Sequence, residues 1–160
     1  MSEKKLKVLF VCLGNICRSP LAEAVFAHKV NNLGLSNKIE TDSCGTAAYH
    51  IGASPDHRSI AVANQHGIPI THAGRQFETS DAEEFQYILA MDQSNHRNII
   101  HALSYKPEGL YLMRDFDPEG KGLDVPDPYY GENDGFEKVY EMLDRSIDEL
   151  INHIRKHQDI

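Results

Sequence analysis

Two residues that could act together on a phosphate group, Cys12 and Arg18, stand six positions apart near the start of the chain. They flank a short loop that follows an apolar run and leads into Ser19-Pro20, a typical helix start. A loop of this length can turn its backbone N–H groups inward, and such a ring beside a helix N-terminus binds tetrahedral anions. The same groups favour the thiolate of Cys12, while the guanidinium of Arg18 matches two phosphate oxygens. The stretch therefore predicts an anion-binding loop with a nucleophile at its floor.

Three neighbouring residues support this interpretation of the loop. Gly14 can adopt a positive φ angle and lets the backbone approach a ligand closely, and Asn15 tolerates the left-handed region. Ser19 can donate a hydrogen bond to the sulfur of Cys12. A cysteine and an arginine at this spacing are weak evidence alone, and the alternative is an ordinary strand–turn–helix with a buried cysteine. The Gly-Asn pair inside the loop and the Ser-Pro pair after it favour the anion-binding loop.

A second polar segment, residues 123–131, contains two carboxylates, Asp124 and Asp127. A thiolate that attacks a phosphate monoester needs a general acid, because an alkoxide or phenoxide leaves poorly. Prolines on both sides of Asp127 stiffen its backbone, and two tyrosines follow directly. The segment is equally consistent with a solvated turn that carries surface tyrosines.

The elements that must position these residues follow from the hydrophobic pattern. Short apolar runs predict strands at residues 6–11, 39–43, 85–91 and 110–113. Cap and stop signals predict helices at residues 19–33, 54–66, 92–103 (capped by Asp92) and 134–154, with a helical turn at 81–84. Asp134 with Glu137 predicts a capping box for the last helix. This alternation predicts a single doubly wound α/β domain, residues 1–160, with a four-stranded parallel sheet flanked by helices on both faces. Ligands of such folds bind at the carboxyl ends of the strands, where Cys12 lies.

Composition restricts the setting and the partners. The net charge of −8 argues against a nucleic-acid surface, and no stretch is long enough to insert into a membrane. Three cysteines do not make a disulfide framework, so we expect a reducing, cytoplasmic location. The nine histidines are scattered without tight ligand spacing, so we expect no metal and no other cofactor.

Residues 12–20 and residues 127–131 together resemble the two signatures of the low-molecular-weight protein tyrosine phosphatases. The resemblance extends between them through Gly67-Ile68-Pro69, Arg75-Gln76, Tyr87-Ile88-Leu89 and the segment 91–95, so it covers nearly the whole chain. It implies hydrolysis of phosphotyrosine in proteins through a phosphocysteine intermediate, and tyrosine-phosphorylated proteins as partners of a monomer or weak homodimer.

The resemblance also implies a role for each matching residue. Cys12 would be the nucleophile, Arg18 would bind phosphate and stabilise the transition state, and Asp127 would be general acid and then general base. Cys17 would be able to pair with Cys12 on oxidation. The loop would be supported by Asn15, Ser19, Ser43 and His72, and the substrate would contact Leu13, Gly14, Asn15, Ile16, Cys17, Ser19, Tyr49, Tyr129 and Tyr130. Many eukaryotic relatives carry Trp in place of Tyr49, which leaves the peptide preference open.

Three alternatives remain, two of them enzymes on the same scaffold and one a non-catalytic module of a different class. Arsenate reduction would need further cysteines to carry a disulfide away, and after Cys17 the chain offers only Cys44. Phosphoarginine phosphatases typically carry Thr where this chain has Ile16, which favours phosphotyrosine. A module that binds phosphate or phosphopeptide without turnover would not need the full set of Cys12, Arg18 and Asp127.

Overall fold

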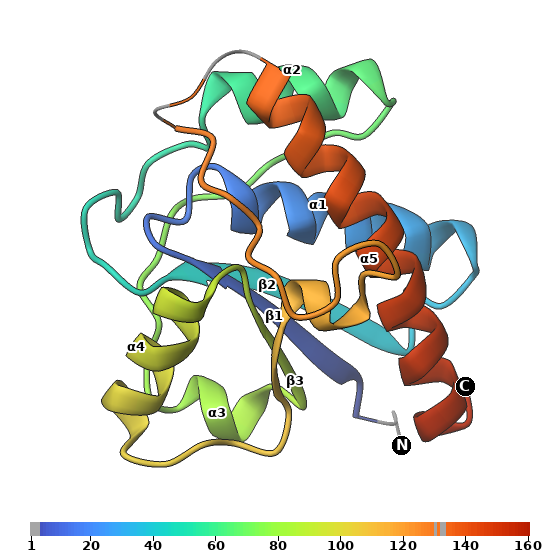
Figure 1. Cartoon of the computed structure of the whole chain (residues 1–160). Coiled ribbons are helices and arrows are strands. Elements are labelled where there is room, and N and C mark those ends of the chain that lie inside the picture. Colours follow the sequence, from blue (N-terminus) through green and yellow to red (C-terminus); the bar gives the residue numbers. More distant parts are fainter. Residues whose placement is uncertain (1–3, 130, 132–133) are drawn as a thin grey trace.

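The chain forms a parallel β-sheet covered by helices on both faces (Figure 1). The computed structural model describes residues 4–129, 131 and 134–160. The four strands are β1 (Leu6–Cys12), β2 (Ile39–Gly45), β3 (Tyr87–Ala90) and β4 (Leu110–Leu112), in the spatial order β2-β1-β3-β4. All three strand pairs are parallel. This confirms the predicted doubly wound α/β fold.

The central strand β1 is apolar on both faces because both faces are covered. Val8 and Phe10 contribute to one core, and Leu9 and Val11 contribute to the other. Helices α1 (Arg18–Asn32) and α5 (Asp134–Gln158) cover the first face, and α2 (His57–Gln65) packs on both of them. Helix α4 (Gln93–Leu103) covers the other face, on the same side as the single turn α3 (Asp81–Glu84) (Figure 1).

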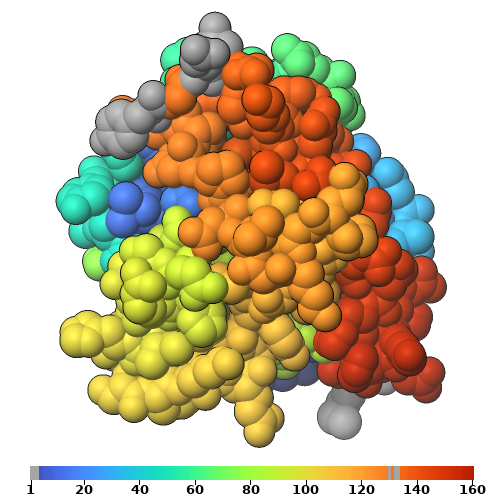
Figure 2. Space-filling view, in the orientation of Figure 1, coloured from blue at the N-terminus to red at the C-terminus, as the bar shows by residue number. Residues whose placement is uncertain are grey.

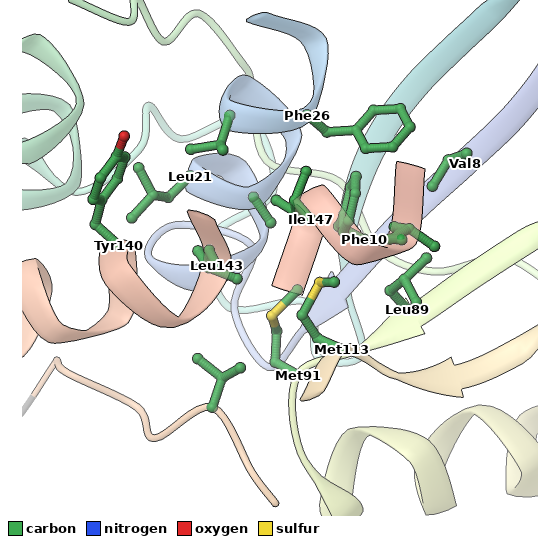
Figure 3. Packing of buried hydrophobic residues seen from close by; sticks show 14 of the residues in the cluster. Val8, Phe10, Leu21, Phe26, Leu89, Met91, Met113, Tyr140, Leu143 and Ile147 are labelled. Atoms are coloured by element: carbon green, nitrogen blue, oxygen red, sulfur yellow. The ribbon is translucent and has the colours of Figure 1, made fainter. Parts of the chain in front are cut away.

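The larger core lies between the sheet, α1 and α5 (Figure 3). Phe10 of β1 meets Phe26 of α1 edge to face, with ring centroids 5.5 Å apart. All the apolar positions that predicted the last helix are buried, namely Phe136, Val139, Tyr140, Leu143, Ile147, Leu150, Ile151 and Ile154. The stripe on α5 therefore fixes this helix against the sheet face from which Cys12 emerges.

Some predicted boundaries were wrong, each for a local reason. Helix α2 begins at His57 rather than at residue 54, because Asp56 caps it by accepting the N–H of Arg58. Helix α5 begins at Asp134, so this residue belongs to the first turn and does not precede the helix as a capping box requires. Strand β4 ends at Leu112 and passes into a 3₁₀ turn, η1 (Met113–Phe116), because Asp115 accepts the N–H of Leu112.

The strand order places a topological switch point between β1 and β3. The chain runs outward from β1 to β2 and, on the other side, from β3 to β4, so the two central strands leave a crevice at their carboxyl ends. Cys12 ends β1 at this crevice, and Asp92 follows β3. The segment after η1 returns to the same edge, where the N–H of Val125 donates to the carbonyl of Met91 at 2.8 Å.

Candidate active site

Cys12 lies at the floor of a cavity of about 310 Å³ at the carboxyl end of β1. Its side chain is almost fully buried, and its Sγ lies 3.0 Å from the hydroxyl of Ser19, in the first turn of α1. Arg18, the first residue of α1, lines the same cavity. We call residues 12–18 the phosphate loop. In Figure 2 a small part of this N-terminal segment, in blue, is visible between the cyan segment near residue 50 and the orange segment before α5.

Asn15 adopts the left-handed conformation that its residue type was expected to tolerate, and its side chain supports the phosphate loop. Asn15 has a φ angle of +58°, whereas Gly14 is not in the left-handed region. The space around Gly14 explains the glycine instead, because a Cβ there would lie 2.9 Å from the His50 ring. The side-chain amide of Asn15 donates to Ser19 Oγ at 2.8 Å and to Ser43 Oγ at 3.1 Å. Four hydrogen bonds stabilise the strained residue in all, since its carbonyl oxygen accepts two more.

The two groups that donate to Asn15 Oδ1 come from the segment before β3. They are the backbone N–H of Arg75, at 3.0 Å, and Nε2 of His72, at 2.7 Å. Behind them, Glu23 accepts the hydroxyl of Ser43 at 2.6 Å and lies 3.3 Å from His72 Nδ1. Burial raises the pKa of Glu23 to about 7, and burial lowers the pKa of His72. The residues expected to support the loop thus form one connected hydrogen-bond network.

The same network contains donor atoms that a divalent cation could bridge. Glu23, Asp42 and His72 each place one such atom within 4.8 Å of the others. Arg75 Nε already donates to Asp42 at 2.9 Å, and His72 is bonded to Asn15. These groups therefore satisfy one another, and we assign them to loop support.

Asp92 and the carbonyl of Val125 hold the side chain of Arg18, and local sequence signals predicted neither contact. Its side chain is only 2% exposed, and Nη1 donates to Asp92 Oδ2 at 2.7 Å and to the carbonyl of Val125 at 2.9 Å. Burial alone would lower the pKa of Arg18, but the nearby Cys12, Asp92 and Asp127 raise it. Asp92 also caps α4 as predicted, accepting the N–H of Asn95 at 2.8 Å. The role of Asp92 in the site could have been predicted from its position, because it is a second polar residue at the carboxyl end of a central strand.

The structure distinguishes the two carboxylates of residues 123–131. Asp127 lines the cavity, with Oδ2 3.6 Å from Arg18 Nη2 and about a third of its side chain exposed. Its other oxygen accepts the N–H of Tyr129 at 3.0 Å. Asp124 is not among the residues that line this cavity, and it accepts the backbone N–H of Gln93 at the start of α4. Asp127 is therefore the carboxyl group that can reach a bound ester.

The mouth of the cavity is partly apolar. Tyr49 is 76% exposed, and Leu13 and Tyr129 are each 39% exposed. Arg58 lies over the ring of Tyr129, with 5.4 Å between the guanidinium carbon and the ring centroid. The expected substrate-contacting residues that line the cavity are Leu13, Gly14, Ile16, Cys17, Tyr49 and Tyr129. His50 lines it too and was not predicted. Asn15 and Ser19 are buried and do not line the cavity, and Tyr130 is outside the described residues.

Cys17 completes the phosphate loop beside α1. It is buried, as is Cys44, and both are free thiols, as is Cys12. Burial raises the pKa of Cys17 and also that of Cys44, so neither forms a thiolate readily. Reversible pairing of Cys12 with Cys17 on oxidation stays a prediction.

Comparison with known proteins agrees with this geometry. Residues 7–159 match the family model described as low molecular weight phosphotyrosine protein phosphatase. A protein of that name from Schizosaccharomyces pombe is 48% identical over 145 residues, which cover 88% of this chain and 91% of the relative. A protein tyrosine phosphatase from Entamoeba histolytica, solved with Hepes in its active site, superimposes with a TM-score of 0.90 at 38% identity and covers 96% of this chain and 99% of its own.

The fold alone does not determine the substrate within such a group of relatives. A Drosophila arginine phosphatase superimposes with a TM-score of 0.85 at 31% identity, covering 94% of this chain and 98% of its own. The family model over residues 7–159 and the relative at 48% identity share one description, that of a phosphotyrosine protein phosphatase. The chain belongs to the low molecular weight phosphotyrosine protein phosphatase family.

Proposed function

We propose that this chain hydrolyses phosphotyrosine in proteins, and small aryl phosphates, through a phosphocysteine intermediate on Cys12. The observation that carries the proposal is that a buried cysteine, a buried arginine and a carboxyl group from a distant loop line one cavity. Relatives of this family are named for phosphotyrosine hydrolysis, and Ile16 and the apolar mouth fit an aryl group. The proteins it acts on are phosphoproteins.

In the first step the phosphate loop binds the dianion, and Arg18 donates to two of its oxygens. Cys12 Sγ forms a bond to phosphorus as the bond from phosphorus to the phenolic oxygen breaks. Asp127, in its protonated form, gives its proton to that oxygen, so a neutral phenol leaves. The hydroxyl of Ser19, 3.0 Å from the sulfur, stabilises the thiolate before attack.

In the second step a water molecule takes the place of the phenol. The carboxylate of Asp127 accepts a proton from the water as its oxygen bonds to phosphorus. The bond between sulfur and phosphorus breaks, which releases inorganic phosphate and returns Cys12 to a thiolate. Arg18 stabilises the equatorial oxygens in both transition states. Water thus supplies the hydroxyl that phosphate gains and the proton that returns to Asp127, so the protein ends the cycle in its starting state.

Rapid-mixing hydrolysis of p-nitrophenyl phosphate in the presence of EDTA tests this proposal. The wild-type protein should release nitrophenol in turnover, with a first-turnover burst when the second step limits the rate, and radiolabelled phosphate should be trapped on the protein by acid. Cys12→Ser should abolish both signals, and Asp127→Ala should lower the rate by roughly 10²–10⁴-fold while phosphate still binds. Tight phosphate binding without turnover would instead support a binding module, and faster hydrolysis of phosphoarginine peptides would support the arginine phosphatase alternative.

The proposal also covers the cellular location and the oligomeric state of the enzyme. Among the residues that the structure describes, no helix is both long and apolar enough to cross a membrane. We expect a cytoplasmic enzyme, because its nucleophile is a free cysteine that oxidation would inactivate, and we expect a monomer or a weak homodimer. Size-exclusion chromatography with light scattering over a range of protein concentrations measures the oligomeric state.

A further inference from the structure

Three charged side chains, the buried Arg114 and Asp117 and the partly exposed Arg145, form a cluster where the segment after β4 packs against α5. Asp117, whose side chain has no exposed surface, accepts Arg114 Nε at 2.8 Å and Arg145 Nε and Nη2 at 2.8 and 3.1 Å. Arg114 belongs to η1, and Arg145 comes from α5. Burial alone would raise the pKa of Asp117, but hydrogen bonds from Arg145, the Glu119 N–H and Arg114 lower it to about 2. The cluster is therefore ionised, and it ties η1 to the long helix.

The guanidinium of Arg114 is confined on a further side by the loop itself. A Cβ on Gly120 would overlap the guanidinium, so the loop passes over this group with no room for a side chain. The backbone carbonyl of Arg114 accepts the N–H groups of Asp117 and Gly122, at 3.1 and 3.0 Å. Side chain and backbone of one residue thus organise residues 114–122.

Arg114 also reaches beyond its own cluster toward the active site. Its Nη1 donates to the backbone carbonyl of Asp124 at 3.0 Å. The next residue, Val125, is fully buried and donates its N–H to Met91, while its carbonyl accepts Nη1 of Arg18 at 2.9 Å. Asp127 follows two residues later. Hydrogen bonds and the backbone of residues 124–127 together therefore connect α5, through Arg114, to Arg18 and to the segment that carries Asp127.

We propose that Arg114 is a positioning residue that sets the segment carrying Asp127 at the cavity. The inference rests on the proposed function, because it assigns to Arg114 the placement of the proposed general acid. A general acid must lie within hydrogen-bond reach of the leaving oxygen, and a displacement of about 1 Å costs about 10²-fold in rate. The two prolines beside Asp127 stiffen residues 126–128 locally, but they do not fix that unit relative to the phosphate loop. The contacts of Val125 with Met91 and Arg18 supply one part of this second constraint, and the bond from Arg114 to Asp124 supplies the other.

The test compares Arg114→Gln with Arg145→Gln as a matched control. Each variant removes one of the two arginines that pair with buried Asp117, so both lower stability, but only Arg114→Gln breaks the contact with Asp124. The measurement is kcat/KM, which reports the first chemical step, for a series of aryl phosphates from phenyl to 2,4-dinitrophenyl phosphate. A nitrophenolate leaves without protonation, whereas a phenolate requires the acid.

We expect Arg114→Gln to lower kcat/KM for phenyl phosphate about tenfold to a hundredfold more than for 2,4-dinitrophenyl phosphate. Arg145→Gln should lower the two by the same factor. Arg114→Lys, which can reach Asp117 or Asp124 but not both, should give an intermediate ratio. Gly120→Ala, which displaces the guanidinium without removing its charge, should reproduce the leaving-group dependence if Arg114→Gln does not fold.

Equal losses for all leaving groups in Arg114→Gln and Gly120→Ala would overturn the inference and leave Arg114 a purely structural residue. A leaving-group dependence of the same size in Arg145→Gln would also overturn it, because that variant keeps the contact with Asp124. A wild-type protein that hydrolyses none of the esters would overturn the proposed function, and the role of Arg114 with it. The wild-type series therefore separates the two failures.

Discussion

Asp92 offers a sharp test of how the active site is held together. One of its oxygens caps α4 by accepting the N–H of Asn95 at 2.8 Å, and the other accepts Nη1 of Arg18 at 2.7 Å. Serine is a good helix cap but too short to maintain the second contact. Asp92→Ser therefore isolates the pairing with Arg18, and Asp92→Ala removes both functions.

The size of the effect follows from burial. Removing one partner of a buried ion pair costs about 3–5 kcal/mol, and an exposed pair contributes about 0–1 kcal/mol. Arg18 is 2% exposed and Asp92 is 20% exposed, so we place this pair between the two limits. Asp92→Ser should lower the free energy of unfolding by about 2–3 kcal/mol. Asp92→Ala should lower it by about 1 kcal/mol more, the usual contribution of a cap.

The nearly isosteric variant Asp92→Asn tests whether both carboxylate oxygens of Asp92 are needed as acceptors. Asparagine has one carbonyl oxygen, so it can cap α4 or accept Arg18 but not both. Its NH₂ group would then face a donor, either the guanidinium of Arg18 or the N–H of Asn95. We therefore expect Asp92→Asn to be at least as destabilising as Asp92→Ser, although its shape is nearly that of the native residue.

Urea unfolding followed by circular dichroism measures the stability, and kcat/KM for p-nitrophenyl phosphate measures the consequence for Arg18. We expect kcat/KM to fall about 10²-fold in Asp92→Ser, as when one preorganised donor is lost. Asp56→Ser is the matched control, because Asp56 also caps a helix and also pairs with an arginine, the less buried Arg58. It should cost less than about 1 kcal/mol. Native stability and native kcat/KM in Asp92→Ser would refute the argument, since Asp92 would then be a helix cap alone.

Two further predictions concern pH. The pKa of Asp117 is lowered to about 2, so its contribution is present above the ordinary carboxyl range and is lost as the pH falls from about 4 to 2. Urea unfolding at pH 5 and pH 2.5 should show a loss of about 2 kcal/mol that Asp117→Asn does not share. The pKa of Glu23 is raised to about 7, so folding favours its protonated form, and that stability is lost as the pH rises from about 4.5 to 7. Glu23→Gln should therefore be more stable than the wild-type protein at pH 8, by about 3 kcal/mol, and a less stable variant there would contradict the sign.

The phosphate loop could be predicted from sequence because its chemistry and its geometry are local. Cys12 ends a buried strand and Arg18 begins a helix, and both signals lie within a few residues of the groups that they position. The parallel sheet followed from the same kind of pattern. Both Gly14 and Asn15 were expected to tolerate a left-handed conformation, and of the two only Asn15 adopts it. The sequence could not decide between them, because the hydrogen-bond partners that hold Asn15 come from residues 43 to 75.

The residues behind Arg18 could not be predicted in the same way. Asp92 had an adequate explanation as a helix cap, and that explanation is correct but incomplete. His50 lines the cavity from an irregular segment whose path no periodicity predicts. Arg114 and Asp117 sit in a stretch that has the composition of a solvated loop, yet both side chains are buried against α5. Their pairing depends on Arg145, 28 residues beyond Asp117, which no local signal connects to them.

The segment between β4 and α5 shows why these unpredicted contacts matter for catalysis. Its prolines and glycines predict irregular backbone, and irregular backbone is usually a poor support for a general acid, which must be placed to within about an ångström. The structure resolves the conflict through contacts directed at the backbone: Arg114 holds the carbonyl of Asp124, and Met91 and Arg18 hold both sides of Val125. Because Arg18 is one of these partners, the group proposed to bind phosphate and the segment proposed to deliver the proton share a hydrogen bond. A change that moves one therefore moves the other, and variants on the two sides of that bond should show non-additive effects on kcat/KM.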